Sequence, residues 1–212
     1  MNISAIKLQD GKMKSLKQYI LEYAKDYDEV GLAMLDYVEG TTTNVNNYLR
    51  DGKVIISKKK INHAIKYMDQ GFKDTWPAGK PLYRTITWDF MENLYGISKD
   101  NIEEHIGDKI LDKGYMSTTH EEQSPWGSTW SDDQLVLVFT AQNNIDCFNV
   151  NKNIHPDDID CEEQMEILLP RDVEFTIDSY EVKKNKRIGK KRFDKEGNYF
   201  IYCTITKCEK KS

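Results

Sequence analysis

The stretch Gln164-Met165-Glu166-Ile167-Leu168-Leu169-Pro170-Arg171 is the most informative part of this 212-residue chain. Residues 163–169 read as a strand, and successive side chains of a strand point to opposite faces. We therefore expect Gln164 and Glu166 to lie on one face of that strand, about 7 Å apart. A Gln-x-Glu pattern alone carries little information, so the preceding sequence must decide what this pair does.

Two clusters upstream strengthen the pattern. Arg84 lies inside the apolar run 82–88, where its fork of donors suits a phosphate bound through two hydrogen bonds. The alternative is an arginine at the edge of the core, paired with a carboxylate. Further along, Ser117, Thr118 and Thr119 follow Gly114-Tyr115-Met116 and form a short strand, in which the middle hydroxyl points away from the other two.

Composition excludes several classes of protein. A length of 212 residues fits one domain with a sizeable core. The formal net charge of −5 argues against a general nucleic-acid binder, which would usually be basic. We expect no metal site, because the histidines are scattered and the cysteines lack metal-ligand spacing. These cysteines are expected to be half-buried structural thiols: Cys147, Cys161, Cys203 and Cys208.

No apolar run reaches the roughly 18 residues of a membrane span, and the N-terminal residues lack the apolar core of a signal peptide. We therefore expect a cytoplasmic protein, or one exported by a route that leaves no mark in this sequence. We also expect a monomer that does not bind membranes.

The periodicity of apolar residues changes once along the chain, from helical spacing to strand-like runs. This order, helices first and a mostly antiparallel β region second, predicts an α+β fold. The predicted helices are 13–27, 30–38, 45–51, 58–68, 89–95 and 99–105. The predicted strands are 82–88, 115–119, 135–140, 147–150, 164–169, 173–182 and 199–207.

In this order and at these spacings, the clusters resemble the signature of mono-ADP-ribosyltransferases: an Arg, a Ser-Thr-Ser-like triplet and a final Glu. Residues 30–206 are similar to the clostridial Rho-modifying exoenzymes and their bacterial and phage relatives. The resemblance implies a single ADP-ribosyltransferase domain over 1–212, with a helical part over 1–75 and a β part over 80–208. The implied fold packs N-terminal helices on two perpendicular antiparallel sheets, with an NAD cleft between them.

The resemblance implies an NAD-binding set in the first half of the chain. Arg84 would hold the pyrophosphate, and the backbone of Thr85, where the family usually has Gly, would bind the nicotinamide amide. Asn46 and Arg50 are four residues apart and share a helix face; in the family this pair reaches NAD. The alternative for these two residues is an ordinary solvent-facing pair.

The resemblance also implies a catalytic set. Cleavage of the nicotinamide–ribose bond builds positive charge on the ribose, which a carboxylate at Glu166 would stabilise. Ser117 would hydrogen-bond Glu166 and leave it ionised. Thr118 would brace the neighbouring strand, and both residues would border the NAD site. Trp126 would stack on the nicotinamide, and Gln164 would select the acceptor.

The function implied is transfer of ADP-ribose from NAD to a macromolecule, with hydrolysis of NAD as a side reaction. A Gln at position 164 goes with asparagine-type protein acceptors in the exoenzymes, while Cys161 stands where they carry an aromatic residue, so Rho itself is not implied.

The acidic segment 154–163 suggests a basic target surface or a solvated loop. The basic cluster 183–192 leaves an RNA acceptor open. A non-catalytic module of the same fold is the third alternative. The role could be that of a toxin, a bacterial or phage effector, or a defence factor.

Overall fold

The computed structural model describes residues 6–7, 13–14, 27–38, 43–54, 57–122, 134–155, 165–183 and 198–210. Its helices are α2 (Glu29–Val38), α3 (Thr43–Asp51), α4 (Lys58–Gly71), α5 (Trp88–Tyr95), the 3-10 helix η1 (Ile102–His105) and α6 (Val150–Asn153). Its strands are β1 (Ile6–Lys7), β2 (Met13–Lys14), β3 (Asp74–Trp76), β4 (Leu82–Thr87), β5 (Lys109–Asp112), β6 (Met116–Thr119), β7 (Gln134–Ala141), β8 (Ile145–Asn149), β9 (Glu166–Leu169), β10 (Val173–Lys183) and β11 (Asn198–Lys207).

The α+β order expected from periodicity is confirmed, and most predicted elements lie within a few residues of the observed ones. The helix expected over 13–27 is wrong at its start, because β2 pairs there with β1 as an antiparallel ribbon. Residues 15–26 of that expected helix lie outside the described part. Strands β3 and β5 were not predicted, since a strand of three or four residues is too short to establish a period of two.

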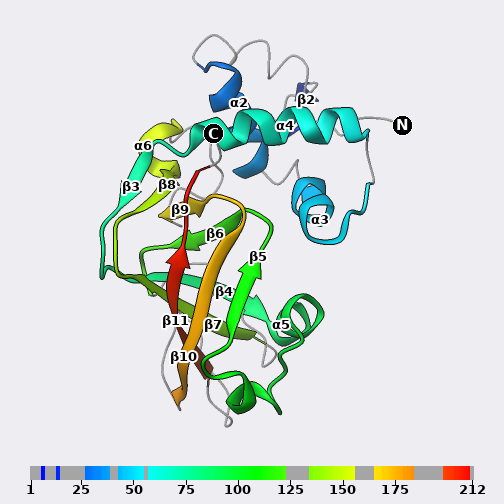
Figure 1. Cartoon of the computed structure of the whole chain (residues 1–212). Coiled ribbons are helices and arrows are strands. Elements are labelled where there is room, and N and C mark those ends of the chain that lie inside the picture. Colours follow the sequence, from blue (N-terminus) through cyan, green and yellow to red (C-terminus); the bar gives the residue numbers. More distant parts are fainter. Residues whose placement is uncertain are drawn as a thin grey trace.

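Helices α2, α3 and α4 gather at one end of the sheet, and α5 lies apart from them beside β4 (Figure 1). Helices α2 and α4 pack closely at Gly71: a Cβ there would lie 2.2 Å from Cε of Met34, so that flexible side chain would have to shift. Helix α5 begins directly after β4: the Thr87 hydroxyl accepts a hydrogen bond from the Phe90 amide at 3.0 Å and caps the helix. It ends at Gly96, which has a φ of 74°.

The larger sheet differs from the expectation of two perpendicular antiparallel sheets. It is one mixed sheet of nine strands in the order β3-β8-β9-β6-β4-β7-β11-β10-β5, and β7 pairs with β11 in parallel. The two expected halves join at a single residue pair, Tyr83 with Thr119, between β4 and β6. This single bridge links the β3-β8-β9-β6 part of the sheet to β4. Strand β4 is paired along its length with β7, so the bridge makes one continuous sheet.

Two apolar clusters hold the layers together. The larger one includes Leu82, Met116, Ile167 and Phe175 from the sheet and Met91 from α5. The other joins α2 and α4 to the strands β8 and β9. Strand β9 contributes to both clusters, since Ile167 and Leu169 face the first and Leu168 faces the second. This is why an unbroken apolar run follows Glu166.

The cysteines of the described part, Cys147, Cys203 and Cys208, are free thiols, and they are buried where half-buried thiols were expected. None of the described helices combines the length and the apolar character that crossing a bilayer demands.

Candidate active site

Glu166 is the first residue of β9, and its side chain is only 9% exposed. Strand β9 lies between β6 and β8, and Glu166 is directly opposite Thr119 on β6. The Ser117 hydroxyl, two residues before Thr119 on β6, donates a hydrogen bond to Oε1 of Glu166. The sheet register therefore brings together a serine and a glutamate that are 49 residues apart in the sequence.

Burial raises the pKa of the Glu166 carboxyl above its usual value of 4.5. The Ser117 hydrogen bond and the positive charge of Arg84 oppose this rise. The site thus contains a carboxylate whose negative charge is poorly solvated by water. Such a charge interacts strongly with any positive charge that develops beside it.

The backbone before Glu166 corrects the expected strand 163–169. Met165 has a φ of 48°, in the left-handed region that side-chain-bearing residues seldom adopt. A left-handed residue turns the chain, so the extended alternation stops there and β9 begins only at Glu166. The strand thus begins later than expected, and because Gln164 lies outside the described residues, its position relative to Glu166 stays a prediction.

Arg84 lies on β4, and its Nη1 atom is buried without a hydrogen-bond partner in the described structure. No carboxylate of the described residues forms an ion pair with it, so the alternative of a core-edge arginine in an ion pair has no support there. Thr85 follows on the same strand and is opposite Val136, so alternation places its side chain on the other face of the sheet from Arg84. A buried guanidinium nitrogen without a partner is a ready donor for an anion.

Asn46 and Arg50, both on α3, bind the protein's own chain. Arg50 donates from Nε and Nη2 to the two oxygens of Asp112, each at 2.8 Å. Asn46 donates to the Tyr115 carbonyl at 3.1 Å and accepts from the Tyr115 amide at 2.8 Å. A Cβ at Gly114 would lie 2.7 Å from Cζ of Arg50 and from Oδ1 of Asn46, so this close approach needs a glycine. The pair therefore anchors the segment that leads into β6, and its contact with NAD stays a prediction.

Asp112 is a site residue that the sequence analysis missed. Its carboxylate is fully buried and accepts hydrogen bonds from Arg50, from the Tyr95 hydroxyl at 2.8 Å and from the Gly114 amide at 2.9 Å. The only sequence signal was an aspartate that follows the apolar pair Ile110-Leu111 and precedes Gly114 by two residues. A buried charge of this kind is stable because it is both paired and hydrogen-bonded.

Two further contacts fix β6 and β9. The buried Thr118 donates its hydroxyl to the Ile167 carbonyl at 2.5 Å, which is the bracing contact expected for it; its contact with NAD stays a prediction. Arg171, just after β9, pairs with Asp69 of α4 at 2.9 Å, and Asp69 also accepts from the Tyr115 hydroxyl at 2.8 Å. The Leu-Leu-Pro-Arg end of the motif thus ties β9 to α4.

Several expected features lie outside the described residues: Trp126, Gln164, Cys161, most of the acidic segment and the basic cluster beyond Lys183. Lys183 itself lies over the Phe200 ring at 3.9 Å and pairs with Glu181 at 2.9 Å. In the described part, no cluster of His, Cys, Asp or Glu is arranged to hold a metal ion.

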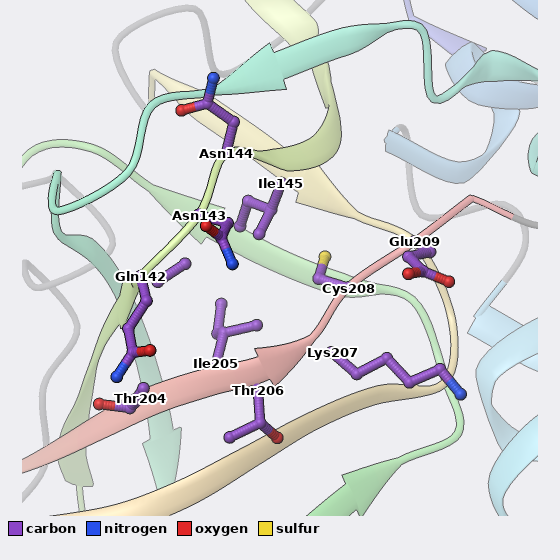
Figure 2. A pocket seen from close by; sticks show the side chains of 11 residues that line it. Gln142, Asn143, Asn144, Ile145, Thr204, Ile205, Thr206, Lys207, Cys208 and Glu209 are labelled. Atoms are coloured by element: carbon purple, nitrogen blue, oxygen red, sulfur yellow. The ribbon is translucent and has the colours of Figure 1, made fainter.

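A separate cavity of about 270 Å³ lies between the β7–β8 connection and the end of β11. Figure 2 shows its lining, with Gln142, Asn143 and Asn144 on one side and Thr206, Lys207 and Cys208 on the other. None of the site residues expected from the sequence lines this cavity.

The α+β fold thus combines a Ser117–Glu166 hydrogen bond with an arginine that has a buried, unpartnered nitrogen. Residues 17–197 match the family model described as ADP-ribosyltransferase exoenzyme, and the chain belongs to this family. No curated protein is similar enough to the sequence to count as a match.

Solved structures show the same fold at low sequence identity. The ADP-ribosyltransferase toxin Plx2a from Paenibacillus larvae is 18% identical, with a TM-score of 0.60 over 90% of this chain and 92% of that one. C3stau2 from S. aureus, solved with NAD, is 16% identical, with a TM-score of 0.65 over 89% and 92%. The Clostridium limosum C3 exoenzyme is 16% identical, with a TM-score of 0.63 over 85% and 86%.

Proposed function

We propose that this protein transfers ADP-ribose from NAD to a side chain of a protein target and releases nicotinamide. The observation that carries the proposal is the buried Glu166 carboxylate, hydrogen-bonded by Ser117 and influenced by the charge of Arg84, whose Nη1 lacks a partner. Family membership supports it, as does the NAD in the structure of the relative C3stau2.

Each of these residues has a defined task in the proposed reaction. Arg84 binds the NAD pyrophosphate through its guanidinium, whose Nη1 lacks a partner in the described structure. As the nicotinamide–ribose bond breaks, positive charge grows on the ribose, and the ionised Glu166 stabilises it. Ser117 orients that carboxylate and favours its ionised form. Water in place of the acceptor would give hydrolysis of NAD as the side reaction.

We further propose that the acceptor is an amide-type side chain selected by Gln164. An amide both donates and accepts hydrogen bonds, so it can align a second amide for attack. In this division of tasks, Glu166 breaks the nicotinamide–ribose bond and Gln164 meets the target.

The test of the transfer reaction uses the purified full chain with NAD labelled in its adenylate part. We expect nicotinamide release and label transfer to a band in cell lysate that protease removes and nuclease leaves. A band removed by nuclease alone would replace the protein acceptor with RNA. Absence of both nicotinamide release and labelling, with NAD binding retained, would favour a non-catalytic module.

Gln164→Ala tests the acceptor proposal on the same preparation. The variant should release nicotinamide at nearly the wild-type rate but transfer little ADP-ribose, because positioning of a nucleophile contributes several kcal/mol to such reactions. Gln142→Ala, which changes an amide in the cavity that none of the expected site residues lines, is the matched control. Transfer at full rate in Gln164→Ala would remove this residue from acceptor selection.

A further inference from the structure

The side chain of Phe90, on α5, lies against two arginines of the site. Cζ of Arg84 lies over its ring, 5.5 Å from the centroid, and Cζ of Arg50 lies over the same ring at 5.4 Å. A guanidinium at this distance is attracted by the negative face of the aromatic ring. One side chain therefore holds cations that come from different elements, β4 and α3.

The two cations differ in how they are neutralised. Arg50 is held by both oxygens of Asp112, whereas no carboxylate of the described residues pairs with Arg84. The Asp112 oxygens also accept from Tyr95 and Gly114, so they are already engaged. The Phe90 ring is then the contact that orients the Arg84 guanidinium while its Nη1 remains free for a ligand.

Phe90 is itself well fixed. Its amide donates to the Thr87 hydroxyl at the start of α5, which sets the helix directly after the strand of Arg84. Its ring meets the Tyr95 ring edge-on, with centroids 6.4 Å apart, and Tyr95 hydrogen-bonds Asp112. The short helix α5 thus contacts both arginines directly through Phe90. It also supports Arg50 indirectly, because Tyr95 bonds the Asp112 carboxylate that pairs with Arg50.

We propose that Phe90 is a positioning residue for NAD: its ring holds the Arg84 guanidinium, beside that of Arg50, in the orientation that binds the pyrophosphate. The inference rests on the proposed function and extends it to a residue that would act on NAD through the arginines. Holding a flexible cation in its binding orientation before the ligand arrives reduces the entropy lost on binding. The loss of the ring should therefore weaken binding of phosphate-bearing ligands more than it slows bond cleavage.

The experiment compares Phe90→Leu, which keeps an apolar side chain, with Phe90→Tyr, which keeps the ring. We expect Phe90→Leu to raise KM for NAD and Kd for ADP-ribose about three- to tenfold, with kcat for nicotinamide release within about twofold of wild type. Phe90→Tyr should restore both constants. Inhibition by nicotinamide, which carries no phosphate, should not change in either variant.

Tyr180→Leu serves as the control for removing a partly buried ring, because Tyr180 stacks on Tyr199 instead of a guanidinium. It should leave KM and kcat unchanged. If Phe90→Leu does not fold, Phe90→Met provides the ringless variant, and circular dichroism checks both.

Wild-type affinity for ADP-ribose in a folded ringless variant would overturn the positioning role, and so would equal losses in Phe90→Leu and Phe90→Tyr. A fall in kcat with unchanged KM would also overturn it. Failure of the wild-type chain to bind NAD would instead overturn the proposed function, and this inference with it.

Discussion

The Ser117 hydroxyl hydrogen-bonds the Glu166 carboxylate across the β6–β9 pair, while the Thr118 hydroxyl next to it bonds the Ile167 carbonyl. Consecutive residues of β6 therefore perform different tasks on the same partner strand. One holds a side chain of the site, and the other holds the backbone that carries it. Because both contacts lie within one register, a shift of that register would remove the two together.

The first prediction concerns the pH dependence of nicotinamide release. Burial raises the pKa of Glu166 and the reaction needs its ionised form, so the acidic limb of kcat/KM should lie above pH 4.5, the usual value for Glu. The Ser117 hydrogen bond lowers this pKa, so Ser117→Ala should move the limb to higher pH. The exposed Ser179 on β10 offers Ser179→Ala as a control with no expected shift. A limb at or below pH 4.5 would contradict the assignment of Glu166.

The second prediction separates activity from stability at Glu166. Glu166→Gln should lower the rate of nicotinamide release about 10²-fold or more, because it removes the charge that stabilises the ribose cation. At neutral pH its unfolding free energy should equal or exceed that of wild type. The reason is that the Glu166 carboxyl has a higher pKa in the folded protein than in the unfolded chain. Its ionisation is therefore less favourable in the folded protein, and the unfolding free energy of wild type falls as pH rises towards the folded pKa.

Urea unfolding at several pH values tests this second prediction. The advantage of Glu166→Gln should shrink as pH falls below the folded pKa towards 4.5 and beyond, where Glu166 is neutral in the folded and the unfolded protein. An advantage that grows at low pH would show that the folded pKa is not raised. Retention of more than a tenth of the wild-type rate would mean that Glu166 is not the catalytic carboxylate.

The third prediction concerns Arg84. Arg84→Lys keeps the positive charge but loses the fork that binds a phosphate through two hydrogen bonds, so Kd for NAD should rise about tenfold, more than kcat falls. Calorimetric titration with NAD measures the change. Arg171→Lys provides the matched control, because Arg171 pairs with Asp69 instead of having a free buried nitrogen. Equal affinity in Arg84→Lys and wild type would place Arg84 outside the co-substrate site.

The fourth prediction concerns the buried carboxylate at Asp112. Asp112→Asn leaves Arg50 in a site where its side chain is only 9% exposed and no longer opposed by a negative charge. Loss of one partner of such a pair should lower the unfolding free energy by about 3 kcal/mol. The exposed pair of Asp51 and Lys53, 3.6 Å apart, gives the contrast, since Asp51→Asn should change stability by less than about 1 kcal/mol. Similar small effects in both variants would show that Asp112 does not hold Arg50 in solution.

Local sequence patterns predicted the element types well, but not how the strands are joined. The apolar run in β7 and the long hairpin strands β10 and β11 were evident from periodicity, because each depends on residues a few positions apart. The parallel pairing of β7 with β11, and the single bridge that merges two expected sheets into one, involve residues far apart in the chain. Periodicity carries no information about such partners.

Through its resemblance to the family signature, the sequence predicted that Arg84, Ser117 and Glu166 belong to one site. The tertiary structure alone revealed the contacts of Asp112 with Arg50 and of Phe90 with both arginines, because these contacts exist only once α3, α5 and the sheet have packed. It also decided that β9 begins at Glu166, since the left-handed Met165 interrupts an alternation that the sequence alone would continue. Spacing along a chain predicts which groups a site uses, whereas packing sets where each group points and which partners neutralise its charge.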